Sequence, residues 1–123
     1  MKVFERVFSI NVMGSLHVVK HAAVQLAKND SSAFSPPERG VIILVSSIQA
    51  KEGQRAQTAY SASKGAINGM VLPMARDLGK YGIRAVAVAP NLIQTPMTGS
   101  SFNPKVMKGI VSQYPMGVLG TPE

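Results

Sequence analysis

A tyrosine and a lysine four positions apart are the residues of this sequence best suited to proton transfer. Tyr60 and Lys64 occupy positions i and i+4 of an expected helix, so their side chains lie one turn apart on the same face. A free phenol has a pKa of about 10, and a neighbouring ammonium lowers it by favouring the phenolate. Such a tyrosine can exchange a proton with an alcohol oxygen. An amphipathic pair that merely covers a helix face has the same spacing, so the interpretation needs support from neighbouring residues.

That support comes from a serine that follows an apolar run. The run at positions 41–45 (VIILV) shows no polar alternation, which predicts a strand buried on both faces of a parallel sheet. Ser46 and Ser47 come directly after it, and ligands of such sheets bind beyond the carboxyl ends of the strands. A Ser47 hydroxyl there can hydrogen-bond the reacting oxygen beside Tyr60. An ordinary strand-to-loop transition would explain Ser47 alone, but it does not explain the combination.

Hydrophobic periodicity predicts the first helix and the loops around the strand. Apolar residues at helical spacing predict a long helix from about Val3 to Lys28, with a break near Gly14. A polar loop is expected from Asn29 to Gly40, where serine, proline and glycine are frequent, and a second loop is expected at 46–57. The strand is therefore flanked by polar connections.

The second half of the sequence predicts a further helix, a further strand and a short helix. A helix is expected at 58–78, ended by Gly79 or Gly82, although Pro73 inside it costs about 3 kcal/mol unless packing compensates. A strand is expected at 83–89, and apolar residues between 106 and 111 mark a shorter helix.

The two strands and the helix between them predict one right-handed βαβ crossover. Two parallel strands are too few for a stable sheet, because a strand that is apolar on both faces needs neighbours and covering helices. Both outer edges of the pair would also be open to aggregation. We therefore expect the chain to be part of a larger sheet.

Composition limits the class of protein. The 123 residues fit one ordinary domain, and the lack of cysteine excludes disulfides, thiolate zinc sites and a cysteine nucleophile. No apolar run of about 20 residues is apparent, and the first residues lack the features of a signal peptide, so no membrane role is expected. The net charge of +7 is compatible with phosphate-bearing partners. Its lysines and arginines are scattered, which favours a solvated basic surface and argues against nucleic-acid binding.

Taken together, the motifs resemble those of the short-chain dehydrogenase/reductase family. The segments that carry the resemblance are 4–7 (FERV), 11–14 (NVMG), 45–47 (VSS), 60–64 (YSASK), 83–90 (IRAVAVAP), 95–96 (TP) and 119–123 (LGTPE). They occur in the order of the family and span nearly the whole chain. The resemblance implies an α/β fold, namely the C-terminal part of a Rossmann-like, doubly wound parallel sheet.

The resemblance also implies a role for each catalytic position. Tyr60 is the general acid/base, Lys64 assists it and binds the nicotinamide ribose, and Ser47 orients the carbonyl or hydroxyl of the substrate. Asn11 corresponds to the asparagine that supports a water-mediated proton relay. The alternative is an asparagine within the helix that faces solvent and has no catalytic role. No metal ligand is implied.

Cofactor and substrate contacts follow from the same resemblance. Ile93 and Thr95 match positions that contact the nicotinamide carboxamide of NAD, although Thr95 could equally be a turn residue before Pro96. The segments 52–54, 59–65 and 72–78 further resemble the 3-hydroxyacyl-CoA dehydrogenases of the family, which also act on hydroxysteroids. In that subgroup Gln54 would touch the substrate, and otherwise it is a polar loop residue. The implied reaction oxidises a 3-hydroxyacyl-CoA or a hydroxysteroid, with hydride passing to NAD.

One part of the family pattern is missing from this sequence. The glycine-rich turn that receives the cofactor pyrophosphate does not occur, and Gly65 and Gly69 lie inside an expected helix. We therefore expect residues 1–123 to form a partial short-chain dehydrogenase domain, a fragment that carries the catalytic part without the first cofactor-binding half.

Two functional hypotheses remain open. In the first, the chain supplies the acid–base residues of an NAD-dependent oxidoreductase that assembles as a homo-oligomer when complete. In the second, it is an inactive fragment that binds full-length subunits through helices 3–28 and 58–78. A stripe of small residues on the latter suits close helix packing, although packing on its own sheet would also explain it. The stripe consists of Ala62, Ala66 and Gly69. The resemblance implies a mitochondrial location, with the cytoplasm as the alternative.

Overall fold

The computed structural model describes residues 1–32, 37–99 and 103–123. Two compact units are present, Met1–Ala89 (the first unit) and Pro90–Glu123 (the second unit). The first contains α1 (Lys2–Phe8), η1 (Ser9–Gly14), α2 (Ser15–Leu26), β1 (Gly40–Val45), η2 (Ile48–Ala50), α3 (Thr58–Gly79) and β2 (Ile83–Val88). The second contains α4 (Pro96–Gly99) and α5 (Pro104–Val111). The long helices, both strands and the shorter α5 were all predicted, whereas η2 and α4 were not.

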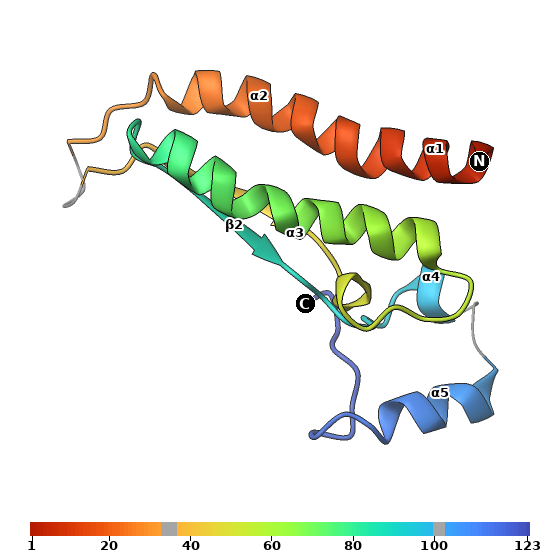
Figure 1. Cartoon of the computed structure of the whole chain (residues 1–123). Coiled ribbons are helices and arrows are strands. Elements are labelled where there is room, and N and C mark those ends of the chain that lie inside the picture. The colour runs from red at the N-terminus through yellow and green to blue at the C-terminus, as the bar shows by residue number, and fades with distance from the viewer. Residues whose placement is uncertain (33–36, 100–102) are drawn as a thin grey trace. The chain divides into compact units, whose positions relative to one another are not determined.

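The N-terminal helix is continuous, and the predicted break near Gly14 is wrong. Gly14 has φ −57° and ψ −48°, so its backbone continues the right-handed helix into α2. The irregularity is instead the π-helical segment η1 between α1 and α2. A π turn holds more residues than an α turn, so it changes the direction in which the following side chains point without interrupting the helix. Figure 1 shows the α1–α2 run lying alongside α3.

Strands β1 and β2 pair in parallel, as the sequence predicted, and α3 connects them (Figure 1). The register joins Ile42 to Ala85 and Leu44 to Ala87 on one face. The α3 connection ends at a turn where Gly82 has φ +70°, and a β-carbon there would lie 3.1 Å from the Pro37 carbonyl oxygen. That close approach explains the glycine at this corner.

One face of the sheet packs against both long helices and forms the core. The buried residues of the core come from α2, β1, α3 and β2, and they are Val19, Ile42, Leu44, Ile67 and Ile83. Pro73 does not interrupt α3, because partly buried side chains around it, such as Met70 and Met74, pack against this core. Burial of the apolar side of α3 therefore compensates for the missing backbone donor.

The other face of the sheet is uncovered in the described part of the chain, so the prediction of a strand buried on both faces is wrong for this structure. Apart from Arg84, the outward side chains of β1 and β2 are aliphatic and exposed by 36–60%. They are Val41, Ile43, Val45, Val86 and Val88. The apolar pattern of the strands is suited to two layers of helices, but α2 and α3 both lie on the same layer.

The second unit is organised by short local elements. An isolated parallel bridge joins Ile93 to Gly120, and Gln94 N–H donates to the Gly120 carbonyl at 2.8 Å. The side chain of Asn103 caps α5 by accepting a hydrogen bond from Lys105 N–H at 2.9 Å. No strand pairing of more than one bridge organises the described residues of this unit.

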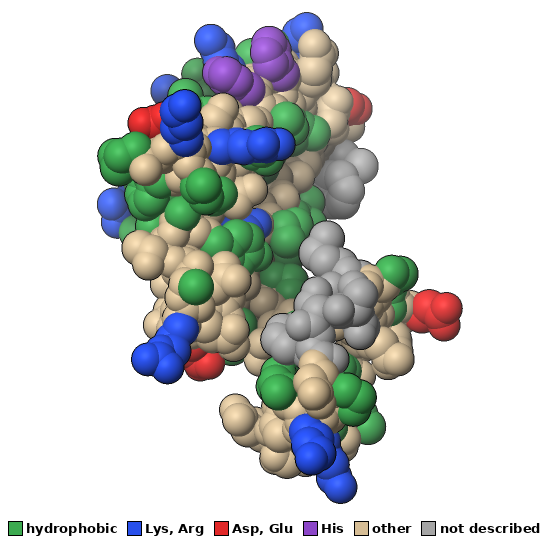
Figure 2. Space-filling view, turned by 90° about the vertical axis from the view of Figure 1, so that its right-hand side faces the viewer, with side chains coloured by type: hydrophobic (Ala, Val, Ile, Leu, Met, Phe, Trp, Pro, Cys, Tyr) green, Lys and Arg blue, Asp and Glu red, His purple; other side chains and the backbone are tan. Residues whose placement is uncertain are grey.

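The surface of the helices is apolar as well as basic. By length and composition alone, Lys2–Leu26 could cross a membrane, which differs from the expectation that no apolar stretch is long enough. The same test is passed by core helices of soluble proteins, so it is weak support for a membrane span. Figure 2 shows lysine and arginine side chains spread among hydrophobic ones on the face in view, with the two histidines adjacent.

Candidate active site

The carboxyl end of β1 is fastened to the first turns of α3 by two reciprocal hydrogen bonds. The Lys64 ammonium donates to the Val45 carbonyl oxygen at 2.8 Å. The hydroxyl of Ser46, which is only 3% exposed, donates to the Lys64 carbonyl oxygen at 3.0 Å. Strand and helix therefore hold Lys64 by its side chain and its backbone at once.

Tyr60 and Lys64 face the same side of α3, as their spacing predicted. The Lys64 Nζ lies 5.6 Å from the centroid of the Tyr60 ring, a cation–π contact. Within the described residues the Tyr60 hydroxyl makes no hydrogen bond, so it is free to engage a substrate oxygen. An ammonium has three donors, and Val45 takes only one of those of Lys64.

Ser47 is placed at the carboxyl end of β1, where the sequence predicted it, and is 8% exposed. Its hydroxyl oxygen accepts a hydrogen bond from Gln49 N–H at 3.2 Å, which caps the short helix η2. Since the oxygen is used as an acceptor, the hydroxyl proton remains available for donation to a ligand. Helix η2 packs against α3, so the loop after Ser47 is carried close to the helix that bears Tyr60.

Asn11 is joined to α3 and does not face solvent. Its side-chain amide donates to the Ser63 hydroxyl at 3.0 Å, and that hydroxyl donates in turn to the Tyr60 carbonyl oxygen at 2.7 Å. The Asn11 carbonyl oxygen accepts a hydrogen bond from the Ser15 hydroxyl at 2.7 Å. The structure therefore brings Asn11, Tyr60 and Lys64 together around the start of α3.

Gln54 lies in the exposed loop between η2 and α3. Its N–H donates to the Gln49 side-chain oxygen at 3.0 Å, and its carbonyl accepts from Gln57 N–H at 3.2 Å. These bonds hold the backbone of Gln54 and leave its side chain without a described partner. A substrate contact through Gln54 thus stays a prediction.

Ile93 and Thr95 belong to the second unit, so they are described apart from the other candidates. A threonine pair builds their turn: the Thr98 hydroxyl donates to the Ile93 carbonyl at 2.7 Å, and Thr95 N–H donates to the Thr98 hydroxyl oxygen at 2.9 Å. The Thr95 and Thr98 hydroxyl oxygens lie 3.3 Å apart. Thr95 is therefore part of a hydrogen-bonded turn, as its alternative interpretation expected, and its contact with a cofactor stays a prediction.

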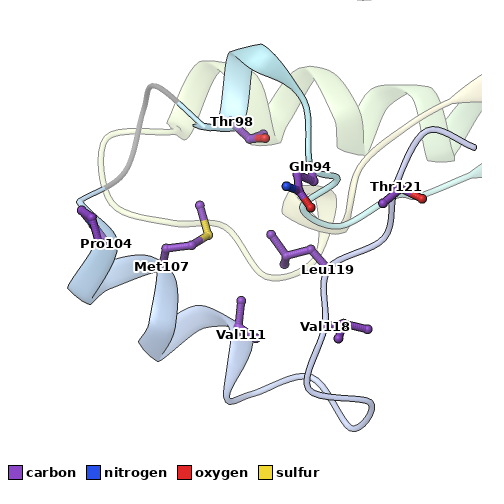
Figure 3. Close-up of a pocket in the computed structure, with 8 residues that line it drawn as sticks. All are labelled: Gln94, Thr98, Pro104, Met107, Val111, Val118, Leu119 and Thr121. Carbon is purple, nitrogen blue, oxygen red and sulfur yellow. The ribbon is translucent and has the colours of Figure 1, made fainter.

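The second unit also contains a pocket of about 770 Å³. In Figure 3 the Met107 and Val111 side chains of α5 and the Leu119 side chain point into the same space, and Gln94, Thr98 and Thr121 add polar groups to the lining. The lining residues are Gln94, Thr98, Pro104, Met107, Val111, Val118, Leu119 and Thr121. An apolar wall with a few polar groups is typical of sites for small organic ligands.

Three residues with site-building contacts were missed in the sequence. Ser46 and Ser63 are both buried and hold Lys64 and Tyr60, and Thr98 organises the turn around Thr95. The only available signal was their position next to a candidate residue, because a serine or threonine has many possible local partners. Among the described residues, no group of three or more His, Asp or Glu side chains could hold a metal ion.

Comparisons with known proteins agree with these motifs. The profile of the family described as short chain dehydrogenase matches residues 1–105. The chain is 44% identical over 120 residues to 3-hydroxyacyl-CoA dehydrogenase type-2 of Homo sapiens, covering 97% of this chain and 45% of that protein. The chain thus spans less than half the length of this relative.

Solved structures give the same result at the level of the fold. The crystal structure of 3-hydroxyacyl-CoA dehydrogenase type-2 from Mycobacterium avium matches with a TM-score of 0.87 at 32% identity, over 97% of this chain and 45% of that one. A 7α-hydroxysteroid dehydrogenase in complex with NADH matches with a TM-score of 0.82 at 30% identity, over 97% of this chain and 44% of that one. The predicted fold class, part of a doubly wound parallel sheet, is confirmed.

Proposed function

The chain belongs to the short-chain dehydrogenase family, and from this premise we propose that it carries the proton-transfer residues of an NAD-dependent oxidoreductase acting on a secondary alcohol or ketone. The observation that carries the proposal is the hydrogen-bonded arrangement of Tyr60 and Lys64 at the carboxyl end of β1. Parallel sheets of this kind bind their ligands at that end.

In the proposed mechanism each residue handles the reacting oxygen or the proton on it. Tyr60 removes the proton from the alcohol oxygen during oxidation and returns it during reduction, because its hydroxyl is not engaged by described residues. Ser47 donates its free hydroxyl proton to the same oxygen and fixes its direction. The Lys64 ammonium, whose Nζ lies 5.6 Å from the centroid of the Tyr60 ring, places a positive charge beside the ring whose hydroxyl exchanges the proton. Asn11, which is hydrogen-bonded to Ser63, is proposed to support a relay that carries the proton from these residues to solvent.

NAD is the cofactor that we assign to the complete site. The two remaining donors of Lys64 and the free hydroxyl of Tyr60 fit the hydroxyls of a ribose. Ile93 and Thr95 would hold the carboxamide. Held by these residues, the cofactor would supply a hydride acceptor as NAD during oxidation and a hydride donor as NADH during reduction. Because the 123 residues include no glycine-rich turn for the pyrophosphate, we propose that this chain alone binds NADH weakly and is inactive.

The substrate that we propose is a 3-hydroxyacyl-CoA, with a hydroxysteroid as the alternative. Both contain a secondary alcohol and a large apolar portion. Considered by itself, the pocket of the second unit has chiefly aliphatic walls and a volume of about 770 Å³, within the range of organic ligand sites. Gln54 is proposed to contact the polar part of the substrate.

Turnover can be tested in a chimera that contains the cofactor-binding half of a relative. We would replace the matched segment of human 3-hydroxyacyl-CoA dehydrogenase type-2 with residues 1–123 and follow NADH formation from a 3-hydroxyacyl-CoA. Tyr60→Phe should lower kcat by about 10²–10⁴-fold, the usual contribution of a general acid or base. Tyr81→Phe is the matched control, since Lys80 Nζ lies 5.1 Å from the Tyr81 ring centroid in a similar cation–π contact. Turnover that survives Tyr60→Phe would remove Tyr60 from its role.

A second candidate function is docking on other subunits without catalysis. Large apolar side chains of α1, η1 and α2, such as Val3, Ile10 and Val18, are 62–74% exposed. A β-carbon built on Gly69 of α3 would meet nothing within 4 Å, so the small-residue stripe borders open space at this residue. These surfaces favour helix pairing with a second subunit, as in the homo-oligomer that we propose for the complete enzyme.

Binding measurements separate the two functions. Titration of the 123-residue chain with NADH, read by cofactor fluorescence, should show no saturable binding at micromolar concentration. Size-exclusion chromatography of the chain with the full-length human relative should show a joint complex if docking occurs, and Gly69→Glu should abolish it. The exposed Gly79→Glu at the end of α3 is the control. Cell fractionation distinguishes the mitochondrial location that we propose from the cytoplasm.

A further inference from the structure

Ser63 is the polar residue most completely enclosed in the described structure. Its side chain is 0% exposed, whereas Ser46 and Ser47 are 3% and 8% exposed. A buried hydroxyl has to satisfy its hydrogen-bonding capacity inside the protein. Ser63 does so in both directions: it accepts a hydrogen bond from the Asn11 amide and donates one to the Tyr60 carbonyl oxygen.

These two bonds connect elements that are far apart in the sequence. The bond to Tyr60 spans three residues within α3, but the bond from Asn11 spans 52 residues and comes from η1. Asn11 lies in a π turn, and π turns in α-helices are frequent at functional sites. The wider turn alters which side chains of the N-terminal helix face α3, and the one that reaches Ser63 is a hydrogen-bond donor.

The neighbouring serine shows that the arrangement is specific to Ser63. Ser61, two positions earlier in α3, also has a buried hydroxyl, but no described residue bonds to it. Both serines lie in the first turns of α3 and both hydroxyls are buried, so burial alone does not explain the hydrogen bonds of Ser63. Only Ser63 links the π turn to the residue that bears the phenol.

We propose that Ser63 is a positioning residue for Tyr60: its hydroxyl transmits the placement of Asn11 in the π turn to the Tyr60 backbone and so directs the phenol toward Lys64. The proposal rests on the proposed function, in which Tyr60 exchanges the proton. It follows from the structure because the Tyr60 ring has a described contact with the Lys64 ammonium, while its hydroxyl has none. The backbone that carries the ring is then one determinant of its direction, beside the Lys64 contact.

The test uses the 123-residue chain and needs neither cofactor nor turnover. The reporter is the nuclear Overhauser cross-peak between the Tyr60 ring and the Lys64 ε-methylene in tyrosine- and lysine-labelled protein. Ser63→Ala should cause loss of this cross-peak, and Asn11→Ala should cause the same loss while leaving Ser63 in place. The double variant should show no further change, since both residues act through one connection. Ser61→Ala, the matched control, should retain the cross-peak.

A merely structural role would give a different result. Ser63→Ala would then lower the unfolding temperature, but the cross-peak would persist in the folded chain, and that outcome would overturn the proposal. If Ser63→Ala does not fold, Asn11→Ala decides the question in the same way. Failure here leaves the Tyr60→Phe turnover test unaffected, and loss of the Tyr60 role in that test leaves the cross-peak result intact, so the two proposals fail independently.

Discussion

The two units of the chain hold their candidate residues in different ways. In the first unit, Lys64 reaches Val45 across 19 residues and Asn11 reaches Ser63 across 52. In the second unit, Thr95 is held by Thr98, three residues away. Long-range contacts depend on the packing of whole elements, whereas a local turn depends mainly on its own residues. Substitutions that break these bonds of the first unit should therefore act across elements, and those in the Thr95–Thr98 turn of the second should remain local.

The largest change in stability is expected from a substitution in the core of the first unit. Ile67 of α3 is 1% exposed and belongs to the cluster that joins the helices to the sheet. Ile67→Ala should lower the free energy of unfolding by about 2–5 kcal/mol through lost burial and a cavity. Val111→Ala, at the pocket of the second unit, should cost less than about 1 kcal/mol. Urea denaturation followed by circular dichroism measures both, and equal effects would contradict the comparison.

A smaller effect is expected from the hydroxyl that joins β1 to α3. Ser46→Ala removes a buried donor to the Lys64 carbonyl and should cost about 1–2 kcal/mol, the usual range for such a hydrogen bond. Ser112 makes a similar bond, to the Gly109 carbonyl at 2.8 Å, but locally and at an exposed position. Ser112→Ala should change stability by less than about 0.5 kcal/mol. Thermal unfolding of both variants compares a long-range hydroxyl with a local one.

The turn of the second unit gives the next prediction. Thr98→Val removes the hydroxyl that bonds Ile93 and Thr95, and it should weaken this turn by about 1 kcal/mol. Hydrogen exchange of the Thr95 amide should accelerate, while protection of the β1 and β2 amides should not change. Faster exchange in the strands would show that the two units are coupled.

The smallest effect is expected for an ion pair whose two residues are far apart in the sequence but lie at the surface. Glu38 and Arg84 form an ion pair at 2.9 Å across 46 residues, but both side chains are partly exposed. The Arg84 hydrogen bond holds the pKa of the Glu38 carboxyl below its ordinary 4.5. A lowered carboxyl pKa gives stability that is present above the unfolded pKa and lost as pH falls through the folded pKa.

Glu38→Gln should therefore reduce the unfolding temperature slightly at neutral pH. Near the acid end of the titration the difference from the unsubstituted chain should vanish, because Glu38 is then protonated. High salt should also diminish it, since exposed ion pairs are screened. A pH-independent difference would mean that the carboxylate charge is not what stabilises the pair.

Much of the fold was predictable because it follows from local patterns. The aliphatic run at 41–45, the helical spacing at 58–78 and the proline at position 90 predicted β1, α3 and the end of β2 within one or two residues. The π turn was not predictable, because α and π turns share nearly the same apolar spacing over six residues. Nor was the uncovered sheet face, because an apolar strand indicates a preference for two covering layers and not their presence in the same chain.

The candidate site was predicted less completely than the fold. Tyr60, Lys64, Ser47 and Asn11 were identified from residue type and order, and the structure places them in the first unit. The residues that hold them, Ser46 and Ser63, were not identified, since their partners come from elements brought together only by folding. Which serine of the segment 60–64 is bonded and which is left without a partner depends on the path of the N-terminal helix.

The π turn also determines what the deletion of one codon would do to the N-terminal helix. A π turn differs from an α turn by one additional residue, so deletion of a single codon within Ser9–Gly14 would restore a regular α-helix. The reading frame and the hydrophobic composition would survive, and side chains on either side of the deletion would keep their directions, because the π turn had absorbed the additional residue; only residues within the former turn would change direction. Asn11 or its replacement would then no longer face Ser63. An in-frame loss of three nucleotides, apparently mild by sequence comparison, would in this helix separate the two halves of one hydrogen-bonded path.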